Sequence, residues 1–418
     1  METAICLFED GGFKEFFPLT YTHPVYDLRC GITTLGEKIA ARFPKHRLIL
    51  HSRLYLQESI KERYPQTPVN QFDFPLILFV NGRLLIGNDS FIQIKKMKEN
   101  SILLSNDGSV VAAKISEDNL KNLIKDNSDL LPFLDMNLDT FESEIILTKY
   151  SWDLVNSNGS QISNDFDLLV KKAPIIDTKK YPSVVFKNRK KIFIGKDAVL
   201  DPFVFIDASD GPVYIGRNVH IMSHTFIQGP AYIGDSSQIK KGASIYHNTS
   251  IGEVCKVGGE VESSIIHPYS NKQHEGFLGH SYLGSWVNIG AGTNNSDLKN
   301  NYENISVLLN GKPVNTGSQF VGLIMGDHSK TAINTMFNTG TIVGVSCNIF
   351  GSGFPPRYIP SFSWGGSEFI KNYDLNKSLE VAKLVLARRD KNFTPSEEDL
   401  LKKIFEMTVE ERSRKIKS

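Results

Sequence analysis

Histidines are the side chains of this sequence best suited to chemistry, and most of them lie in its second half. Seven of the ten fall between residues 220 and 328. They are His220, His224, His247, His267, His274, His280 and His328. Imidazole transfers protons near neutral pH and is also a common zinc ligand. The cluster therefore indicates a general base, or a zinc ion held by three histidines.

Two other groups of polar residues in the same half have no evident structural purpose. They are Asp297, Lys299 and Asn300, followed by Asp327, His328 and Lys330. Carboxylates and cations that gather in loops often contact substrates, although hydrogen bonding within the loop would also account for them. Both interpretations stay open at this point.

A repeat of six residues organises the segment that must position these groups. Aliphatic residues stand six apart at Ile194, Leu200 and Ile206, and the series resumes after a three-residue insertion. It then runs through Ile215, Ile221, Ile227, Ile233, Ile239, Ile245, Ile251 and Val257. An α-helix repeats every 3.6 residues and a strand every two, so neither gives this period. A coil of three short strands does, because each turn stacks one aliphatic residue per corner on the turn below.

The repeat is interrupted twice, at residues 260–276 and 294–314. Insertions in a coil of this kind form loops on one face, which is commonly the ligand-binding face. We therefore expect binding residues near these two interruptions.

The N-terminal part is expected to form a mixed α/β domain. Apolar runs at residues 4–8, 47–50 and 76–80 have the length of buried strands, and helical patterns such as that of residues 33–42 lie between them. Strands that alternate with helices favour a parallel sheet with crossover connections.

Composition shifts place the domain junction near residue 180. Residues 156–165 are polar and rich in Asn and Ser, and residues 187–191 are basic. After the coil, a helical pattern at 378–389 and a capping box at Thr394 and Glu397 predict a helical tail. The predicted boundaries are 1–180 for the α/β domain, 181–365 for the coil and 366–418 for the tail.

Composition also limits the function classes. The 418 residues include 47 basic and 46 acidic side chains, and a net charge of +1 argues against a general nucleic-acid or membrane-surface binder. No apolar run approaches the roughly 18 residues of a membrane span, and the N-terminus has no signal-peptide pattern. The four cysteines form no CxxC pair. We expect a cytoplasmic protein with no nucleic-acid or membrane partner.

Two segments of the coil are similar to a known family. HEGFLG at 274–279, followed by VNIGAGT at 287–293, resembles the acetyltransferase site of the GlmU family, the bifunctional glucosamine-1-phosphate N-acetyltransferases and N-acetylglucosamine-1-phosphate uridyltransferases. Asn288 follows His274 by 14 residues, in agreement with that family. The blocks SNKQHEGFLGHSYLG, GAGTNNSDLKNNY, GDHSKTAINT and PSFSWGG are similar to a divergent GlmU-like family of sugar nucleotidyltransferases, and this resemblance extends over nearly the whole chain.

The resemblance implies a fold, a reaction and an assembly. The fold is an α/β nucleotidyltransferase-like (Rossmann-like) domain followed by a left-handed parallel β-helix and a helical tail. The reaction is N-acetyl transfer from acetyl-CoA to an amino-sugar phosphate such as glucosamine-1-phosphate, with nucleotidyl transfer to the sugar phosphate by the first domain, in UDP-N-acetylglucosamine biosynthesis. The assembly is a homotrimer with each acyltransferase site between neighbouring subunits.

The resemblance also assigns the catalytic residues of the β-helix. His274 would be the base, because an ammonium group cannot attack a thioester, and Asn288 would hold the sugar or the oxyanion that develops. Phe277 replaces a tyrosine of the family and would keep an aromatic wall. Backbone N–H groups at Ala291 and Gly292 would bind the thioester or the CoA arm.

Further contacts are assigned by the same resemblance. Glu262 stands where the family has a phosphate-binding lysine, so another lysine would replace it. The candidates for this role are Lys240, Lys241, Lys256 and Lys272. Asp297 and Lys299 are expected to contact the substrate, and Asp327 and His328 the acetyl-CoA.

Near the N-terminus, residues 8–20 (FEDGGFKEFFPLT) are similar to the nucleotidyltransferase loop LAAGxGTRxxPLT. Gly11 and Gly12 would then bind the nucleotide. Three charges differ from the family: Glu15 replaces an arginine, Val25 a lysine, and Arg83 the metal-binding aspartate.

Nucleotidyl transfer needs cations on the phosphates and a carboxylate for Mg²⁺. Lys14, Arg29 and Arg83 would bind the phosphates in a rearranged site, with Mg²⁺ on Glu9 or Asp10.

Two other functions are compatible with the sequence. One is a sugar-nucleotide-binding regulatory or scaffold protein built from two catalytically decayed folds. The other is a zinc enzyme of the hexapeptide carbonic anhydrase type, with three histidines at a subunit interface. The full ligand pattern of that type is absent from the sequence, so we assign no residue to a metal.

Overall fold

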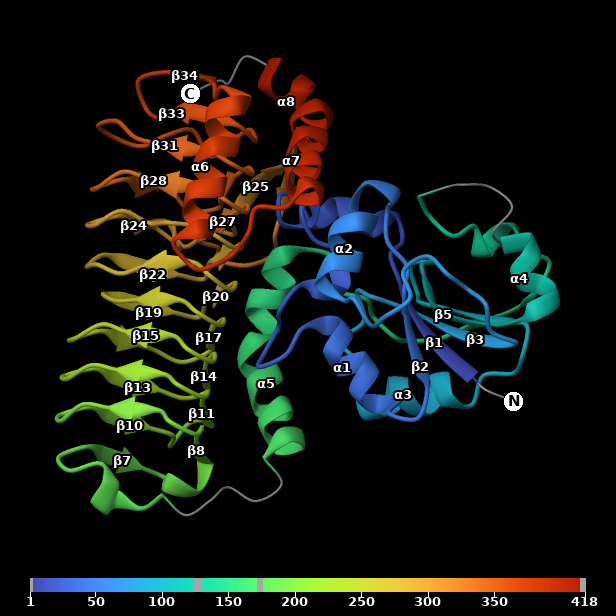
Figure 1. Cartoon of the computed structure of the whole chain (residues 1–418), viewed down its shortest axis with the longest axis horizontal. Helices are drawn as coiled ribbons and strands as arrows, with labels where there is room; N and C mark the ends of the chain where they lie inside the picture. The colour runs from blue at the N-terminus through green and yellow to red at the C-terminus, as the bar shows by residue number, and fades with distance from the viewer. Residues whose placement is uncertain (1–2, 124–128, 171–175, 414–418) are drawn as a thin grey trace.

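The computed structural model of the chain describes residues 3–123, 129–170 and 176–413. Figure 1 shows a tall β-helix beside an α/β domain, with the long helix α5 (Ser151–Leu169) between them. The C-terminal helices lie over the last coils of the β-helix and also reach the α/β domain. The predicted fold class is confirmed, whereas the three domain boundaries stay a prediction.

A six-stranded sheet forms the centre of the N-terminal domain, in the order β2-β1-β3-β5-β4-β6. Its strands are β1 (Thr3–Phe8), β2 (Arg47–Leu50), β3 (Leu76–Asn81), β4 (Ser101–Leu104), β5 (Val110–Ser116) and β6 (Asp139–Glu142). β1 pairs in parallel with β2 and β3, as predicted, but β5 is antiparallel to both β3 and β4. The expectation of a parallel sheet is wrong for this half, because a tight turn rather than a crossover helix joins β4 to β5.

Short helices surround this sheet. They are α1 (Leu35–Arg42), α2 (Gln57–Arg63), α3 (Asn88–Lys95) and α4 (Glu117–Leu123), with 3-10 helices η1 (Gly11–Phe16), η2 (Leu19–Tyr21), η3 (Val25–Asp27), η4 (Leu54–Leu56) and η5 (Phe133–Asp135). α1 begins at a capping box in which Thr34 accepts from the Glu37 N–H.

Helix α5 contains the polar stretch that lies before the predicted domain junction. The Asn/Ser-rich stretch 156–165 lies inside it, and its polar side chains hold the two bodies together. Asn158 donates to the Asn248 carbonyl of the β-helix at 2.7 Å and accepts from the Gly31 N–H at 2.7 Å. Asp165 accepts from the Ile32 N–H at 2.8 Å. Asn158 and Asp165 of this stretch are therefore buried at the interface.

Three sheets of parallel strands wind into the β-helix, apart from one antiparallel strand at the end of the third sheet. The first contains β7 (Val185–Lys187), β10 (Phe205–Asp207), β13 (Phe226–Gln228), β16 (Ser244–Ile245), β19 (Glu260–Glu262) and β22 (Phe277–Gly279). The second contains β8 (Ile192–Ile194), β11 (Val213–Ile215), β14 (Ala231–Ile233), β17 (Thr249–Ile251), β20 (Ile265–Ile266), β23 (Tyr282–Leu283), β27 (Leu323–Met325), β30 (Thr341–Val343) and β32 (Tyr358–Ile359).

The third sheet is formed in two parts. They are β9 (Val199–Leu200), β12 (His220–Ile221), β15 (Gln238–Ile239), β18 (Lys256–Val257) and β21 (Asn271–Lys272), and then β28 (Lys330–Thr331), β31 (Asn348–Ile349), β33 (Ser363–Gly365) and β34 (Ile370–Asn372). Main-chain bridges from Asn288 to Asn271 and to Lys330 join the two parts. The remaining short elements are β24 (Asn294–Asn295), β29 (Met336–Phe337), η6 (Thr178–Lys180) and η7 (Arg189–Lys191).

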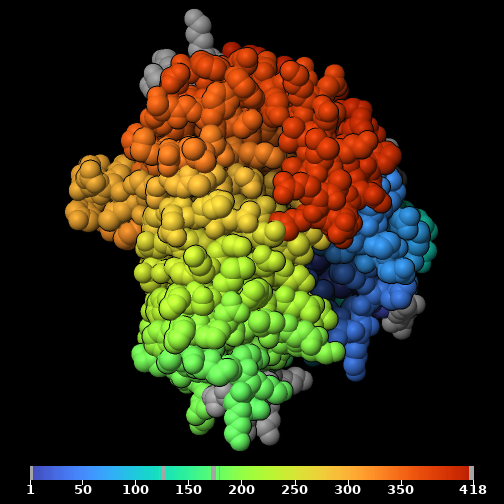
Figure 2. All heavy atoms as spheres, turned by 60° about the vertical axis from the view of Figure 1, so that its left-hand side comes forward, coloured from blue at the N-terminus to red at the C-terminus, as the bar shows by residue number. Residues whose placement is uncertain are grey.

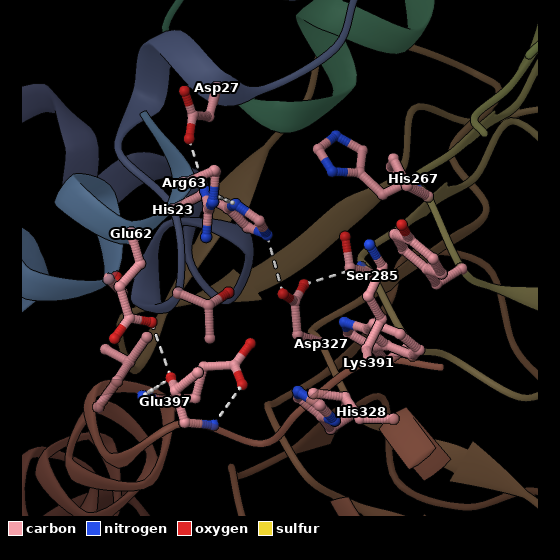
Figure 3. Close-up of a pocket in the computed structure, with 18 of the residues that line it drawn as sticks. His23, Asp27, Glu62, Arg63, His267, Ser285, Asp327, His328, Lys391 and Glu397 are labelled. Carbon is pink, nitrogen blue, oxygen red and sulfur yellow. Dashed lines mark hydrogen bonds and ion pairs between the residues drawn. The ribbon is translucent and has the colours of Figure 1, made fainter. Parts of the chain in front are cut away.

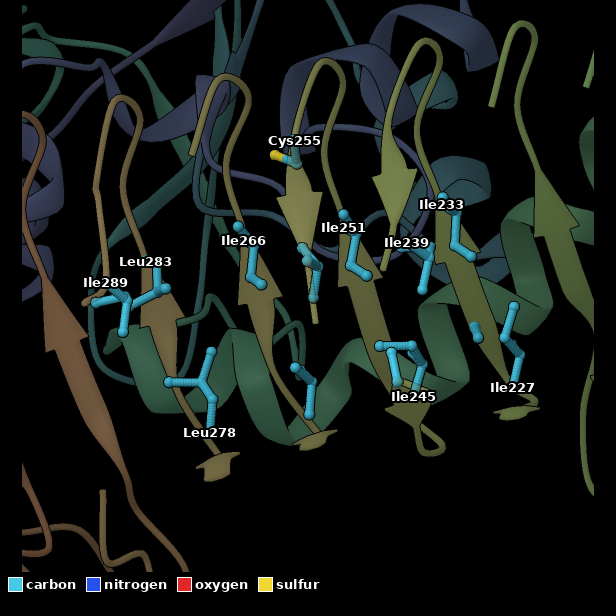
Figure 4. Packing of buried hydrophobic residues seen from close by; sticks show 14 of the residues in the cluster. Ile227, Ile233, Ile239, Ile245, Ile251, Cys255, Ile266, Leu278, Leu283 and Ile289 are labelled. Atoms are coloured by element: carbon cyan, nitrogen blue, oxygen red, sulfur yellow. The ribbon is translucent and has the colours of Figure 1, made fainter. Parts of the chain in front are cut away.

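The six-residue repeat builds the interior of these coils. Ile227, Ile245 and Val261 stack in one column, because β13 pairs with β16 and β16 with β19 in the same register. Figure 4 shows these columns of aliphatic side chains pointing into the coil, where nearly all are fully buried. Burial of each such side chain contributes about 1.5–3 kcal/mol, so the stack supplies most of the stability of this body.

The two interruptions of the repeat have different structures. Residues 260–276 stay in the coil, since β19, β20 and β21 remain paired with the strands of the preceding coil. The six-residue spacing is lost here because two corners of this coil are shortened. The expected loop is therefore reduced to the turn 273–276. In the second interruption a hairpin of β25 (Ser306–Leu309) and β26 (Lys312–Asn315) leaves the coil and joins a hydrophobic cluster with the α/β domain.

The tail consists of α6 (Leu375–Ala387), α7 (Pro395–Met407) and α8 (Val409–Ser413). The predicted capping box at Thr394 and Glu397 is present at the start of α7. Leu379, Leu400 and Ile404 pack into the same cluster as Leu56 and Ile60 of the α/β domain. Among the described helices, none is both long and apolar enough to cross a membrane.

Candidate functional site

His274 lies on the turn 273–276, which joins β21 to β22 at one corner of the β-helix. The next coil stacks directly on this turn, because the Gly292 N–H donates to the Glu275 carbonyl at 3.0 Å. The structure thus brings the turn of His274 beside Gly292, and the roles of these residues stay predictions. The imidazole is exposed and forms no hydrogen bond or ion pair with any residue in the described part of the chain.

Lys272 occupies an interior position of the coil. It pairs with Val257 in the column that otherwise holds aliphatic side chains, and it is 2% exposed. Its Nζ donates to the carbonyl oxygens of Gly258 at 2.9 Å and His274 at 3.0 Å. Burial lowers the pKa of this ammonium to about 8. Lys272 therefore holds the turn of His274 from inside and cannot reach a ligand outside the coil.

The corner that carries Ala291 and Gly292 has one free donor. Gly292 adopts φ +69°, and its N–H is used by Glu275. The Ala291 N–H makes no hydrogen bond with the described residues, while its carbonyl accepts from the Asn334 N–H at 2.7 Å. Of the two predicted donors, only the Ala291 N–H is therefore available to an oxyanion.

The predicted substrate contacts Phe277, Asp297 and Lys299 are all partly exposed. Phe277 donates its N–H to Asn294 at 2.7 Å, and its side chain is partly exposed. Asp297 accepts from His280 Nδ1 at 2.8 Å, in a partly buried ion pair. Lys299 donates to the Asn304 carbonyl at 3.0 Å within the second interruption. The roles of these residues stay predictions.

Lys240, a candidate for the sugar phosphate, lies on a lower coil than His274, and so does Glu262, which stands at the family's lysine position. Lys240 lies two coils below the turn of His274. Its N–H donates to the carbonyl of Val257 on the next coil, and the Gly258 N–H of that coil donates to the carbonyl of Lys272 on the coil after it. Glu262 is 3.5 Å from His247 in an ion pair. Lys240 is thus placed apart from His274.

A cavity of about 280 Å³ opens beside Asn288, between the third sheet and the end of α6. We call it the cationic cavity. It is lined by Lys256, Tyr269, Asn271, Gln273, Trp286, Asn288, Lys330, Val385, Arg388 and Arg389, with no carboxylate. His274 is one residue beyond this lining. Sequence reasoning missed the two arginines, because nothing in the pattern of the tail shows which face of the β-helix it covers.

A second cavity, of about 570 Å³, lies where the α/β domain, the β-helix and the C-terminal helices meet. We call it the interdomain cavity, and Figure 2 shows a hollow at this junction. Figure 3 shows the side chains that converge on it from all three parts. Asp327, His328 and Arg29 line this cavity. The structure therefore separates Asp327 and His328 from His274, and Arg29 from the loop of Gly11.

A chain of polar contacts crosses the interdomain cavity. Arg63 donates to His23 Nδ1 at 2.9 Å, so the His23 Nε2–H donates to Asp327, 2.8 Å away. Although burial raises the pKa of the Asp327 carboxyl, His23 lowers it further, and it lies below its ordinary value. Burial, reinforced by Lys330, lowers the pKa of His328 to about 4, so this imidazole is neutral at pH 7. Its Nδ1 is buried without a partner among the described residues.

The N-terminal loop holds the charges of Asp10 and Arg83 in an internal ion pair. Gly11, Gly12 and Arg83 line a cavity of about 550 Å³ there, together with Lys149, whereas Lys14 is not part of its lining. Arg83 donates through Nε to Asp10 at 2.8 Å, and its guanidinium lies against Gly12.

Neither predicted carboxylate fits Mg²⁺. Both oxygens of Asp10 accept N–H bonds, from Gly12 and Arg83 on one and from Asn81 and Arg83 on the other. Glu9 is fully buried against Arg53, 3.0 Å away. For the zinc alternative, the described residues contain no group of three or more His, Cys, Asp or Glu side chains placed to hold a metal.

Comparison with known proteins extends the sequence resemblance. Residues 5–173 match the family model described as sugar nucleotidyl transferase. A bifunctional sugar-1-phosphate nucleotidylyltransferase/acetyltransferase from Sulfurisphaera tokodaii is 26% identical over 353 residues, which cover 80% of this chain and 79% of that protein. This chain is similar to sugar nucleotidyltransferases and to bifunctional nucleotidylyltransferase/acetyltransferases.

Other relatives match this chain over shorter segments. The bifunctional protein GlmU of Rippkaea orientalis is 29% identical over 36% of this chain, and the matched segment covers 28% of that protein. A solved structure, the UDP-N-acetylglucosamine acyltransferase from Campylobacter jejuni, covers 55% of this chain and is itself covered over 84%, at 16% identity and a TM-score of 0.30.

Proposed function

We propose that the β-helix transfers an acetyl group from acetyl-CoA to the amine of an amino-sugar phosphate of the glucosamine-1-phosphate kind. The observation that carries this proposal is the stacking of the His274 turn on the Ala291–Gly292 corner through the Gly292–Glu275 hydrogen bond. It places an unpartnered imidazole one coil away from an unused backbone donor. A collinear relative named as a nucleotidylyltransferase/acetyltransferase, matched over 80% of the chain, supports the same reaction.

In this reaction the free amine attacks the thioester carbon, the C–S bond breaks and the thiol of CoA leaves. His274 takes the proton that the nitrogen loses on attack, which is general base catalysis. The Ala291 N–H stabilises the developing oxyanion, and Asn288 binds the sugar.

We also propose that the protein acts as a homotrimer, with His274 facing a neighbouring subunit. The exposure of its imidazole at a corner of the coil supports this arrangement, since a base that serves a bound sugar needs a second wall around it.

Nucleotidyl transfer to the sugar phosphate is a second candidate function, for the N-terminal domain. The cavity beside Gly11 and Gly12 and the sugar nucleotidyl transferase match over residues 5–173 favour it. Any such reaction would require Arg83 to leave Asp10, because the ion pair uses the charges that a triphosphate or a metal would need.

One incubation separates these functions. The protein is mixed with glucosamine-1-phosphate, acetyl-CoA, UTP and Mg²⁺, and free CoA and pyrophosphate are followed separately. Release of CoA is expected. Pyrophosphate in addition would support the second reaction, and neither product would favour a regulatory binding protein instead.

A further inference from the structure

The cationic cavity lies between two parts of the chain, and both parts contribute cations to it. Lys256 and Lys330 come from the third sheet of the β-helix, whereas Arg388 and Arg389 come from the end of α6, which lies beside the upper coils (Figure 1). None of the four forms an ion pair with a residue in the described part of the chain, and no carboxylate lines the cavity. Positive charges therefore face each other across the junction of the tail and the β-helix.

The β-helix wall of this cavity is a column of hydrogen-bond donors. Four residues pair in register on successive coils, namely Lys256, Asn271, Asn288 and Lys330. They alternate with interior side chains such as Val257 and Ile289, so they point outward. The Arg389 Nη2 donates to the Oδ1 of Asn271 at 2.8 Å, which leaves the Nδ2 of Asn271 without a partner among the described residues. The wall therefore offers more N–H donors than these residues of the chain satisfy.

Cations held on both sides of a junction oppose the docking of the two parts. Burial lowers the pKa of Lys330 to about 8, and burial together with Arg389 lowers the pKa of Lys256. Lys330 still carries its proton at pH 7, so the repulsion persists unless an anion lies between the two sides. Guanidinium, ammonium and amide N–H groups together are typical of oxyanion recognition. The volume of about 280 Å³ is below the roughly 300–1,000 Å³ of sites for drug-sized ligands, which favours a small anion.

We propose that the cationic cavity binds an inorganic oxyanion of the phosphate class, which clamps the C-terminal tail to the β-helix. The anion lies between the arginines at the end of α6 and the donor column of the third sheet, and it attracts both sides. Of the residues assigned to acetyl transfer, Asn288 lines the cavity, whereas His274, Ala291 and Gly292 do not. The clamp therefore goes beyond the proposed function and does not depend on it. The phosphate ester of an acceptor sugar is the alternative occupant that the test must exclude.

The test uses the full-length protein and isothermal titration with inorganic phosphate, with chloride at the same ionic strength as the reference. Phosphate should bind, and it should slow hydrogen exchange of the backbone amides of α6 because the tail is held more firmly. Glucosamine-1-phosphate is titrated separately, so that the two occupants are compared on the same protein.

Two variants remove one cation from each side of the cavity. They are Lys256→Met and Arg388→Ser, and neither wild-type side chain forms a hydrogen bond or ion pair with the described residues. Each variant should weaken phosphate binding by roughly tenfold. In phosphate-free buffer each should be at least as resistant to urea as the wild type, because it relieves the repulsion. Lys383→Ser is the matched control, since Lys383 is exposed on α6 and does not line the cavity.

Each outcome decides the proposal. Phosphate binding and protection of α6 that both variants weaken and Lys383→Ser does not would support the clamp. An equal effect of chloride, no binding of phosphate, affinity that neither variant changes, or variants less stable than the wild type in phosphate-free buffer would overturn it. Tighter binding of glucosamine-1-phosphate than of phosphate, with the same dependence on Lys256 and Arg388, would place the cavity in the acceptor site and refute the clamp, leaving acetyl transfer intact. Phosphate binding to a protein that releases no CoA would refute acetyl transfer and leave the clamp.

Discussion

The Nζ of Lys272 donates a hydrogen bond to the carbonyl oxygen of His274 from inside the β-helix, at 3.0 Å. A lysine thus stands in a column of aliphatic side chains and holds the turn on which the proposed base lies. A buried ammonium is unfavourable for folding, so its presence here is best explained by the position that it gives to His274.

Replacement of Lys272 by methionine should separate these two effects. Lys272→Met restores an apolar side chain to the column but releases the turn, so acetyl transfer should fall by roughly 10–10²-fold while the fold remains. Steady-state CoA release and circular dichroism of the same preparation measure both. Full activity of the variant would show that the Lys272–His274 hydrogen bond has no functional role.

Stability should also depend on pH through Lys272. Its pKa is lowered from 10.5 to about 8, so the unfolded chain binds more protons between these values and the free energy of unfolding should rise with pH across this window. At about 1.4 kcal/mol per pKa unit, the difference between wild type and Lys272→Met should change by roughly 3 kcal/mol between pH 7.5 and pH 10.5. Urea unfolding at several pH values tests it, and a constant difference would contradict the burial argument.

Arg83→Asp, which restores the carboxylate of the related enzymes, should not improve nucleotidyl transfer. It breaks the ion pair with Asp10 and places two carboxylates beside Gly12, while Glu15 and Val25 remain unlike the family. We expect a loss of stability of about 3–5 kcal/mol and no gain in Mg²⁺-dependent pyrophosphate release from UTP. An increase in that release would show that Arg83 had blocked a working site.

Light scattering tests the assembly. With a chain mass of 46.8 kDa, the proposed homotrimer should give three times that value at micromolar concentration. A monomer at that concentration would remove the model in which His274 faces a neighbouring subunit.

The sequence predicted the β-helix well because its stability depends on a local repeat that the sequence shows directly. It predicted the sites less well where contacts between distant segments decide the structure. The shortened corners of residues 260–276 appeared as an insertion, because a loss of register looks the same whether residues are added or removed. Asp327 and His328 were expected with His274, but Asp327 pairs with His23 of the other domain. The arginines at the end of α6 gave no signal, since only the packing of the tail places them beside Asn288.

The central claim, acetyl transfer with His274 as the base, is tested most directly by the turnover of His274→Ala. CoA release from acetyl-CoA with glucosamine-1-phosphate should fall by roughly 10²–10⁴-fold, while the fold and the trimer persist because the side chain is exposed on a turn. His224→Ala, at another exposed histidine on a lower coil, should leave turnover unchanged, and His280→Ala should cost less than His274→Ala although it breaks the ion pair with Asp297. Unchanged turnover of His274→Ala, or a larger loss with His280→Ala, would contradict the assignment.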